Sequence, residues 1–474
     1  MLLFTGCVSH RATPVPTTPV VPFSETGTVV PSTRWWTEFS DAGLNQYVEQ
    51  ALGGNFTLAA ALQRLRAARA FARREASDLL PDINGVIGSD TTLGSGIRDT
   101  DYSLGLASAY QVDLWGQIQS RVDAERFRAQ ATLADYHAVA LALAAEVSQV
   151  WFALIESYAQ LDLLAGQIES NRRGLKSQEL RFGRGFVRSA DVLRQRQLVE
   201  QTLEQEVIVK ARIAVLEHQL AVLLGHLPQM ANYVTGATLP DLPPLPETGL
   251  SSELLMRRPD VKSSYLTLVA ADRDLASAIS ARYPRLNLTG SVLNAAENPE
   301  TLFRDWIVSI SSQLIAPLFD GGERRSEIAR TDALVCQRFN EYGQTMLNAF
   351  REVEDALAQE RFQKQRIERI NAQVKLAGQA SEQLRQQYLI GDADYLDVLS
   401  AIQAQQQLQR DSLSARLDLI LFRIQLYLAL AGDFDTCPQV AVDAGLEAMP
   451  PMGSPSILEA PVDVEELPPA PERP

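Results

Sequence analysis

The decisive stretch of the sequence is YLIGDADYLDVL, residues 388–399, which predicts a tight turn between two helices. A single glycine, Gly391, interrupts a run of helix-forming residues. Three acidic residues, Asp392, Asp394 and Asp397, follow the glycine before the apolar pattern resumes. The segment therefore predicts a helical hairpin that carries carboxylates at its tip.

A second copy of this pattern lies 206 residues earlier, at residues 182–193, with the sequence FGRGFVRSADVL. Gly185 takes the place of Gly391, and Asp191 takes the place of Asp397. Other pairs at nearly the same spacing extend the match, which indicates an internal duplication. Each half is expected to contain a helix, two strands, a long helix, a turn and a shorter helix.

Long blocks without proline lie beside both turns. There is no proline in residues 82–227 or in residues 318–437, and both blocks are rich in good helix formers. Residues 117–181 and 323–387 each predict a near-continuous helix about 100 Å long, at about 1.5 Å per residue. Helices of this length are expected to pack in a coiled-coil-like bundle.

Four segments with alternating apolar and polar residues precede the long helices, at 83–93, 102–112, 286–292 and 306–314. This period of two predicts strands with one apolar face. A soluble sandwich and a membrane barrel both show this pattern. Single-chain barrels need at least about eight strands, so these four could close a barrel only by pooling strands from several copies.

The composition excludes several functions. The 474-residue chain has a net charge of −15, whereas a nucleic-acid surface needs a basic stripe. The cysteines Cys7, Cys336 and Cys437 and the four histidines are scattered, so the sequence predicts no disulfide framework, metal site or cofactor. No phosphate loop or nucleophile motif occurs, and we expect no enzyme activity. No run of about 18 consecutive apolar residues predicts a membrane-spanning helix.

Residues 1–7, MLLFTGC, resemble the end of a bacterial lipoprotein signal. In such signals the cysteine becomes the lipidated, palmitate-carrying first residue of the mature protein. The stretch lacks a basic region, and its apolar part is short. Cys7 is therefore either a lipidation site or an ordinary cysteine.

An ordered set of motifs resembles the TolC-like outer-membrane efflux proteins, and especially the lipoprotein branch that serves resistance-nodulation-division pumps. The motifs extend over about residues 35–432. They are WWTEFSDAGLNQYVEQAL at 35–52, NFTLAAALQRLRAARA at 55–70, YQVDLWG at 110–116, LLMRRPDV at 254–261, ARYPRLNLTG at 281–290 and PLFDGG at 317–322.

The resemblance implies an α+β fold, with a long periplasmic α-helical barrel and four strands per protomer. Three copies would form a homotrimer with a twelve-stranded β-barrel in the outer membrane of a Gram-negative bacterium. The implied partners are a periplasmic adaptor, an inner-membrane efflux pump and outer-membrane lipid. The implied function is a passive exit duct for small molecules, as in multidrug resistance.

Proline-rich segments and the duplication divide the chain into six parts. They are a remnant of a lipoprotein signal at 1–7, an extended tether at 8–34, the first repeat at 35–225, a proline-rich linker at 226–250, the second repeat at 251–432 and an acidic, proline-rich tail at 433–474 that is expected to be disordered.

The resemblance also implies a periplasmic gate just after the second helix turn. The matching positions are Leu396, Asp397 and Ser400; relatives often have a second aspartate at the last of these. Aspartates from three copies would crowd together, which favours bound cations or raised pKa values. Asp392 and Asp394 have an alternative role as caps of the following helix.

Two other functions fit the same sequence features. The fold also serves as an exit duct for type I protein secretion, and a soluble coiled-coil scaffold would share the helical pattern. The efflux cargo cannot be identified from the sequence, because the six methionines and four histidines form no metal-relay pattern.

Overall fold

A computed structural model describes most of the chain, and all the described residues belong to one compact unit, Met1–Phe434. The predicted lipidation site Cys7, most of the tether and the tail from 433 onward lie outside the described residues. The described residues are 22–29, 32–94, 97–230, 233, 238–248, 257–296, 300 and 303–430.

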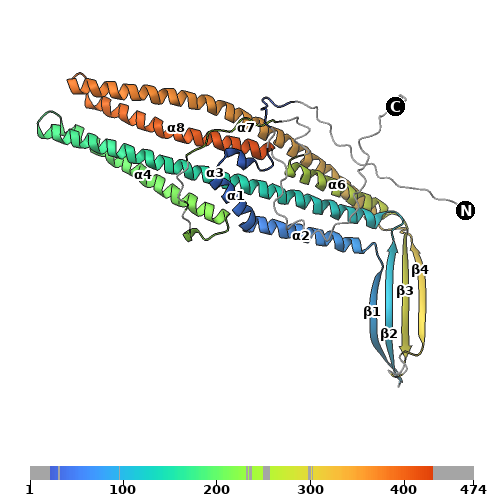
Figure 1. Cartoon of the computed structure of the whole chain (residues 1–474). Helices are drawn as coiled ribbons and strands as arrows, with labels where there is room; N and C mark the ends of the chain where they lie inside the picture. Colours follow the sequence, from blue (N-terminus) through green and yellow to red (C-terminus); the bar gives the residue numbers. More distant parts are fainter. Residues whose placement is uncertain are drawn as a thin grey trace, which may run out of the picture. The chain divides into compact units, whose positions relative to one another are not determined.

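Both halves contain two strands, a long helix and a shorter helix in the predicted order, but the first half has two additional helices before its strands (Figure 1). The first half contains the helices η1 (Trp35–Phe39), α1 (Ala42–Gly54) and α2 (Phe56–Ser77), the strands β1 (Asp82–Gly94) and β2 (Ile97–Val112), and the helices α3 (Gln117–Gly183) and α4 (Ser189–Leu223). The short helix η2 (Pro228–Met230) begins the linker. The second half contains α6 (Pro259–Ser280), β3 (Arg285–Ala296), β4 (Trp306–Ile315), α7 (Glu323–Ile390) and α8 (Tyr395–Leu430).

The four strands form one antiparallel sheet in the order β1-β2-β3-β4. The weakly alternating segment at 83–93 is a strand because it pairs along its whole length with β2, from Asp82 opposite Ala109 to Gly94 opposite Ile97. Within the described chain, β1 and β4 each pair on one side only. The sheet therefore has two open edges, and every side chain of β4 is exposed.

The helices beside the sheet pack in the same order as the strands. Helix α2 packs against α3, α3 against α6, and α6 against α7. Toward their other ends, α3 packs against α4 and α8, and α7 packs against α8 (Figure 1). One 18-residue window of α3 has a mean hydropathy of 1.9, high enough for a membrane-spanning helix. In the structure 67% of this window is buried, because α3 has neighbours on several sides. The window was not predicted, because its apolar residues are not consecutive in the sequence. Its burial among the other helices is typical of a core helix.

The long helices match their predicted length and extend slightly further. Helix α3 has 67 residues and α7 has 68, or about 100 Å each at about 1.5 Å per residue. Helix α3 ends at Gly183 rather than 181, and α7 ends at Ile390 rather than 387.

Aromatic residues from both ends of the described chain form part of the core. Trp35 stacks on Tyr427 with ring centroids 5.4 Å apart, and Phe39 packs against Phe152 at 5.1 Å. The hydroxyl of Tyr427 donates a hydrogen bond to Glu38. Burial and this contact with the Glu38 carboxylate raise the pKa of Tyr427, so the hydroxyl keeps its proton. Residues separated by almost the whole described chain are therefore packed together.

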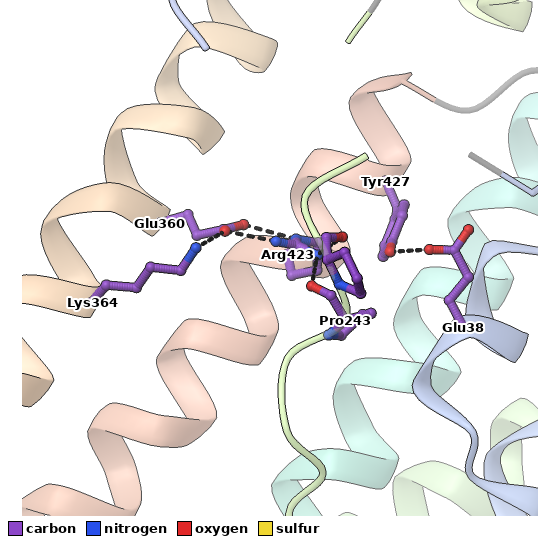
Figure 2. A network of polar contacts seen from close by, with 7 residues as sticks. Glu38, Pro243, Glu360, Lys364, Arg423 and Tyr427 are labelled. Atoms are coloured by element: carbon purple, nitrogen blue, oxygen red, sulfur yellow. Dashed lines mark hydrogen bonds and ion pairs between the residues drawn. The ribbon is translucent and has the colours of Figure 1, made fainter. Parts of the chain in front are cut away.

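A buried ion pair lies next to this aromatic cluster (Figure 2). Arg423 of α8 is fully buried and donates hydrogen bonds to both carboxylate oxygens of Glu360, at 2.8 and 2.7 Å. Its third nitrogen donates to the carbonyl oxygens of Pro243 and Pro244 in the linker, at 2.5 and 2.8 Å. Lys364 also donates to Glu360, at 2.7 Å. Arg423 thus binds the linker to the middle of α7.

Candidate gate at the helix tips

The two predicted turns have the same backbone geometry. Gly185 and Gly391 have φ angles of 78° and 88°, in the left-handed region that favours glycine. After the first turn, Phe186 N donates to Arg181 O at 3.0 Å, and after the second, Asp392 N donates to Gln387 O at 2.9 Å. These bonds satisfy helix-end carbonyls that would otherwise lack partners.

The first residues of α8 separate into a buried face and an exposed face. Tyr395, Val398 and Leu399 are buried. The predicted gate residues Leu396, Asp397 and Ser400 are all exposed on the opposite side of the helix, and Leu396 is 48% exposed. The Ser400 hydroxyl donates to Leu396 O at 2.8 Å, so it is held against its own helix. The three predicted positions therefore form one outward-facing surface.

Tyr395 joins the two hairpins from the buried side. Its hydroxyl donates to Gln195 Oε1 on α4 at 2.5 Å, and Gln195 Nε2 donates to Asn171 O on α3 at 2.8 Å. Burial raises the pKa of Tyr395, so the hydroxyl remains a donor. The neighbouring Tyr388 packs on the Tyr395 ring at 5.2 Å and donates to Gln178 Oε1 at 3.2 Å. This cluster was not among the sequence-based predictions, although the two tyrosines seven residues apart on either side of the turn are a visible signal.

A seam of amide side chains continues from this cluster along α3 and α8. Asn171 and Gln406 exchange hydrogen bonds at 3.2 and 2.9 Å. Gln167 donates to Gln406 O at 3.2 Å and accepts from Arg410 at 2.7 Å. Between α4 and α8 the seam borders a cavity of about 350 Å³. Its lining includes Gln201, Gln205, Gln403 and Gln407.

The two tips carry opposite charges on the same backbone. Residues 180–196 contain five arginines and one aspartate, whereas residues 386–402 contain three aspartates and no basic residue. In the first tip Asp191 lies 3.7 Å from Arg194. Asp397 occupies the equivalent place in the second tip, and among the described residues no cation lies within 4 Å of its carboxylate.

The structure offers little support for a capping role of the other turn aspartates. Asp392 and Asp394 are exposed, and within the described chain their side chains accept no hydrogen bond from the first turn of α8. The backbone carbonyl of Asp394 accepts from Asp397 N at 3.2 Å. The positive φ of Gly391 therefore shapes the turn, and the two carboxylates are exposed to solvent.

The described residues contain no group of three or more His, Cys, Asp or Glu side chains arranged to hold a metal ion. The candidate site is thus a charged surface at the ends of four helices. An open-edged sheet that continues into helices of about 100 Å is the architecture that the family resemblance implies.

The sequence matches the profile of a known protein family. The profile of the family described as "Outer membrane efflux protein" matches residues 47–226 and 250–432, which is most of the chain. The protein belongs to this family, and it is an outer-membrane component of an efflux system. Residues 227–249 separate the two matched segments.

Similar proteins have related descriptions. The chain is 28% identical to the toluene efflux pump outer membrane protein TtgI of Pseudomonas putida, over 83% of this chain and 86% of the relative. It is 27% identical to the cation efflux system protein CusC of Escherichia coli, over 84% of this chain and 88% of the relative. The solved structure of the outer-membrane channel OprN has a TM-score of 0.83 and 25% identity, covering 88% of this chain and 98% of that one.

Proposed function

We propose that the protein works as a homotrimer and forms a passive exit duct through the outer membrane. The observation that carries this proposal is the four-stranded sheet with two open edges. An exposed strand edge presents unpaired N–H and C=O groups, which cannot remain unpaired in a bilayer. Three copies pairing β4 with β1 of the next copy would close twelve strands into a barrel, which exceeds the minimum of about eight.

The duct is proposed to receive its cargo from an inner-membrane pump through a periplasmic adaptor. Relatives named as parts of efflux pumps support these partners. Relatives at nearly equal identity are described as toluene efflux, cation efflux and pyoverdine export proteins. Similarity therefore does not select one cargo, and we assign small molecules as the class. The chain contributes no chemistry of its own in this proposal.

Leu396, Asp397 and Ser400 are proposed to line the resting constriction. Their exposure on one face of α8, opposite the face that packs on α4, supports this role. An aspartate near a threefold axis meets two copies of itself, and crowded carboxylates attract cations. Lipidation of Cys7 is proposed as an additional anchor, and mass spectrometry of the mature N-terminus tests it directly.

Fractionation and deletion test the duct. We expect the protein in outer membranes as a trimer that survives mild detergent. A deletion strain should become more susceptible to small toxic compounds, and the wild-type gene should restore resistance. A water-soluble monomer would refute the channel, and normal resistance with loss of a secreted protein would identify a protein-secretion duct instead.

A further inference from the structure

The loop between β4 and α7 displays the two most exposed large apolar side chains of the described residues. Leu318 is 95% exposed and Phe319 is 92% exposed. Both lie just beyond Ile315, where β4 ends, and just before the N-terminus of α7. Apolar side chains exposed this fully are typical of surfaces that are covered in an assembly.

The loop is nevertheless held firmly. Asp320 Oδ1 accepts a hydrogen bond from Gly322 N at 2.9 Å, and its other oxygen accepts from Arg324 Nη1 at 2.8 Å. The hydrogen bond from Arg324 lowers the pKa of Asp320, so this contact persists at neutral pH. Arg324 Nε donates in turn to Ala281 O at 3.1 Å. The two apolar side chains are thus presented by a fixed turn.

The corresponding loop of the first repeat shows what such a turn contacts. Between β2 and α3, Trp115 stacks on Tyr283 with ring centroids 5.0 Å apart. Its Nε1 donates to Pro284 O at 2.8 Å, and Ser280 Oγ donates to Trp115 O at 3.0 Å. The strand-to-helix loop of one repeat therefore packs on the helix-to-strand junction of the next repeat.

The helix-to-strand junction of the first repeat has the same design but no such loop on it within the described chain. Ser77 and Pro81 match Ser280 and Pro284 at a spacing of 203 residues. Leu80, in the place of Tyr283, is 69% exposed. Within the described chain, the β4–α7 loop packs on no following junction, and the α2–β1 junction is covered by no preceding loop. Inside the chain, a loop and a junction of these two kinds pack together at Trp115 and Tyr283.

These two features lie at the two open sides of the protomer. Strands and helices share one order, so β4 and α7 are outermost at one side, and β1 and α2 at the other. When β4 pairs in antiparallel fashion with β1 of a neighbour, Ile315 comes to lie next to the neighbour's Asp82. The loop after β4 then reaches the neighbour's α2–β1 junction.

We propose that Leu318 and Phe319 pack against the Leu80–Pro81 junction of the neighbouring copy, as Trp115 packs against Tyr283 and Pro284 within one chain. The inference rests on the proposed trimer and adds a specific apolar contact to it. The contact would extend the interface between copies from the paired strands β4 and β1 to the adjoining ends of the helices. It would lock the register between copies where barrel and helices meet.

Cysteine cross-linking tests this contact in the full-length protein. With Cys336→Ser and Cys437→Ser as background, the pair Phe319→Cys and Leu80→Cys should form covalent dimers and trimers after mild oxidation. Either cysteine alone should leave monomers on a denaturing gel. The matched pair Ile310→Cys and Leu80→Cys should not cross-link, because Ile310 lies about 16 Å along β4 from Ile315, at about 3.3 Å per residue.

The outcomes separate this inference from the proposed function. A trimer in mild detergent that gives no Phe319–Leu80 product would overturn the contact and leave the trimer standing; the two side chains would then face lipid. Absence of any trimer would overturn both. As an independent readout, Phe319→Ala should lower the temperature at which the trimer dissociates by several degrees. A shift no larger than that of Ile310→Ala would also overturn the contact.

Discussion

The helical body is held differently at the middle of α7 and at the tips. In the middle, the fully buried Arg423 binds Glu360, which is only 2% exposed. At the tips, Tyr395 and Gln195 join the hairpins through a neutral hydrogen bond. Separating a buried ion pair leaves an uncompensated charge, whereas water replaces a neutral hydrogen bond at small net cost. We therefore expect the middle to stay fixed while the tips can separate.

The largest expected effect comes from breaking the ion pair. Glu360→Gln removes the charge that compensates Arg423 and should destabilise the protein by about 3–5 kcal/mol. Thermal unfolding in detergent measures the loss. The matched control is Glu382→Gln on the same helix, where the partner Arg385 is exposed and no measurable change is expected. Equal effects of the two substitutions would contradict the assignment of the middle as the fixed region.

Acid should weaken the middle of the helical body through Glu360. Burial alone would raise the pKa of Glu360, but hydrogen bonds from Arg423 and Lys364 outweigh it and hold the pKa below the usual 4.5. The pair therefore stabilises fully above about pH 4.5, and its contribution is lost as the pH falls through the lowered pKa. Unfolding between pH 5 and pH 3, roughly the window set by this shift, should depend less on pH in Glu360→Gln than in the wild type.

A smaller effect is expected from loosening the tips. Tyr395→Phe leaves Gln195 Oε1 without its buried donor and should destabilise the closed tip by about 1–2 kcal/mol. The mean conductance of the reconstituted channel should rise. Tyr388→Phe is the control, because its bond to Gln178 is longer, at 3.2 Å, and less buried. An unchanged conductance in Tyr395→Phe would remove this bond from the closed state.

Asp397→Ala is expected to have the smallest effect on stability. Its expected effect is on the conductance of the channel. The residue is exposed, so folding should be unchanged, but conductance should rise and block by divalent cations should weaken. Asp191→Ala, at the equivalent place next to Arg194, should leave both properties unchanged. No difference between the two variants would show that the acidic tip does not form the constriction.

The sequence was sufficient for the parts of the fold that depend on local pattern. Proline-free blocks placed α3 and α7 to within three residues, and the repeated glycines located both turns. The segment at 83–93 was the weakest strand prediction, because its residues alternate poorly between apolar and polar. It forms a strand because it pairs with β2.

The contacts between the halves could not be predicted in the same way. Gln195 and Tyr395 are 200 residues apart, and glutamine is common on solvated helix faces, so nothing local marks it as the acceptor of a buried hydroxyl. Arg423 likewise resembles any helical arginine until Glu360 and the linker carbonyls surround it. The proposed gate positions came from family resemblance, and the structure adds that they share an exposed face.

The cluster around Arg423 also has a consequence for the order of biosynthesis. Ribosomes and export machinery deliver a chain from its N-terminus, so Glu38 arrives long before Arg423 and Tyr427. Until they arrive, Trp35 and Glu360 lack their partners. The Trp35 stack and the buried pair can therefore form only after the last helix, α8, has been delivered.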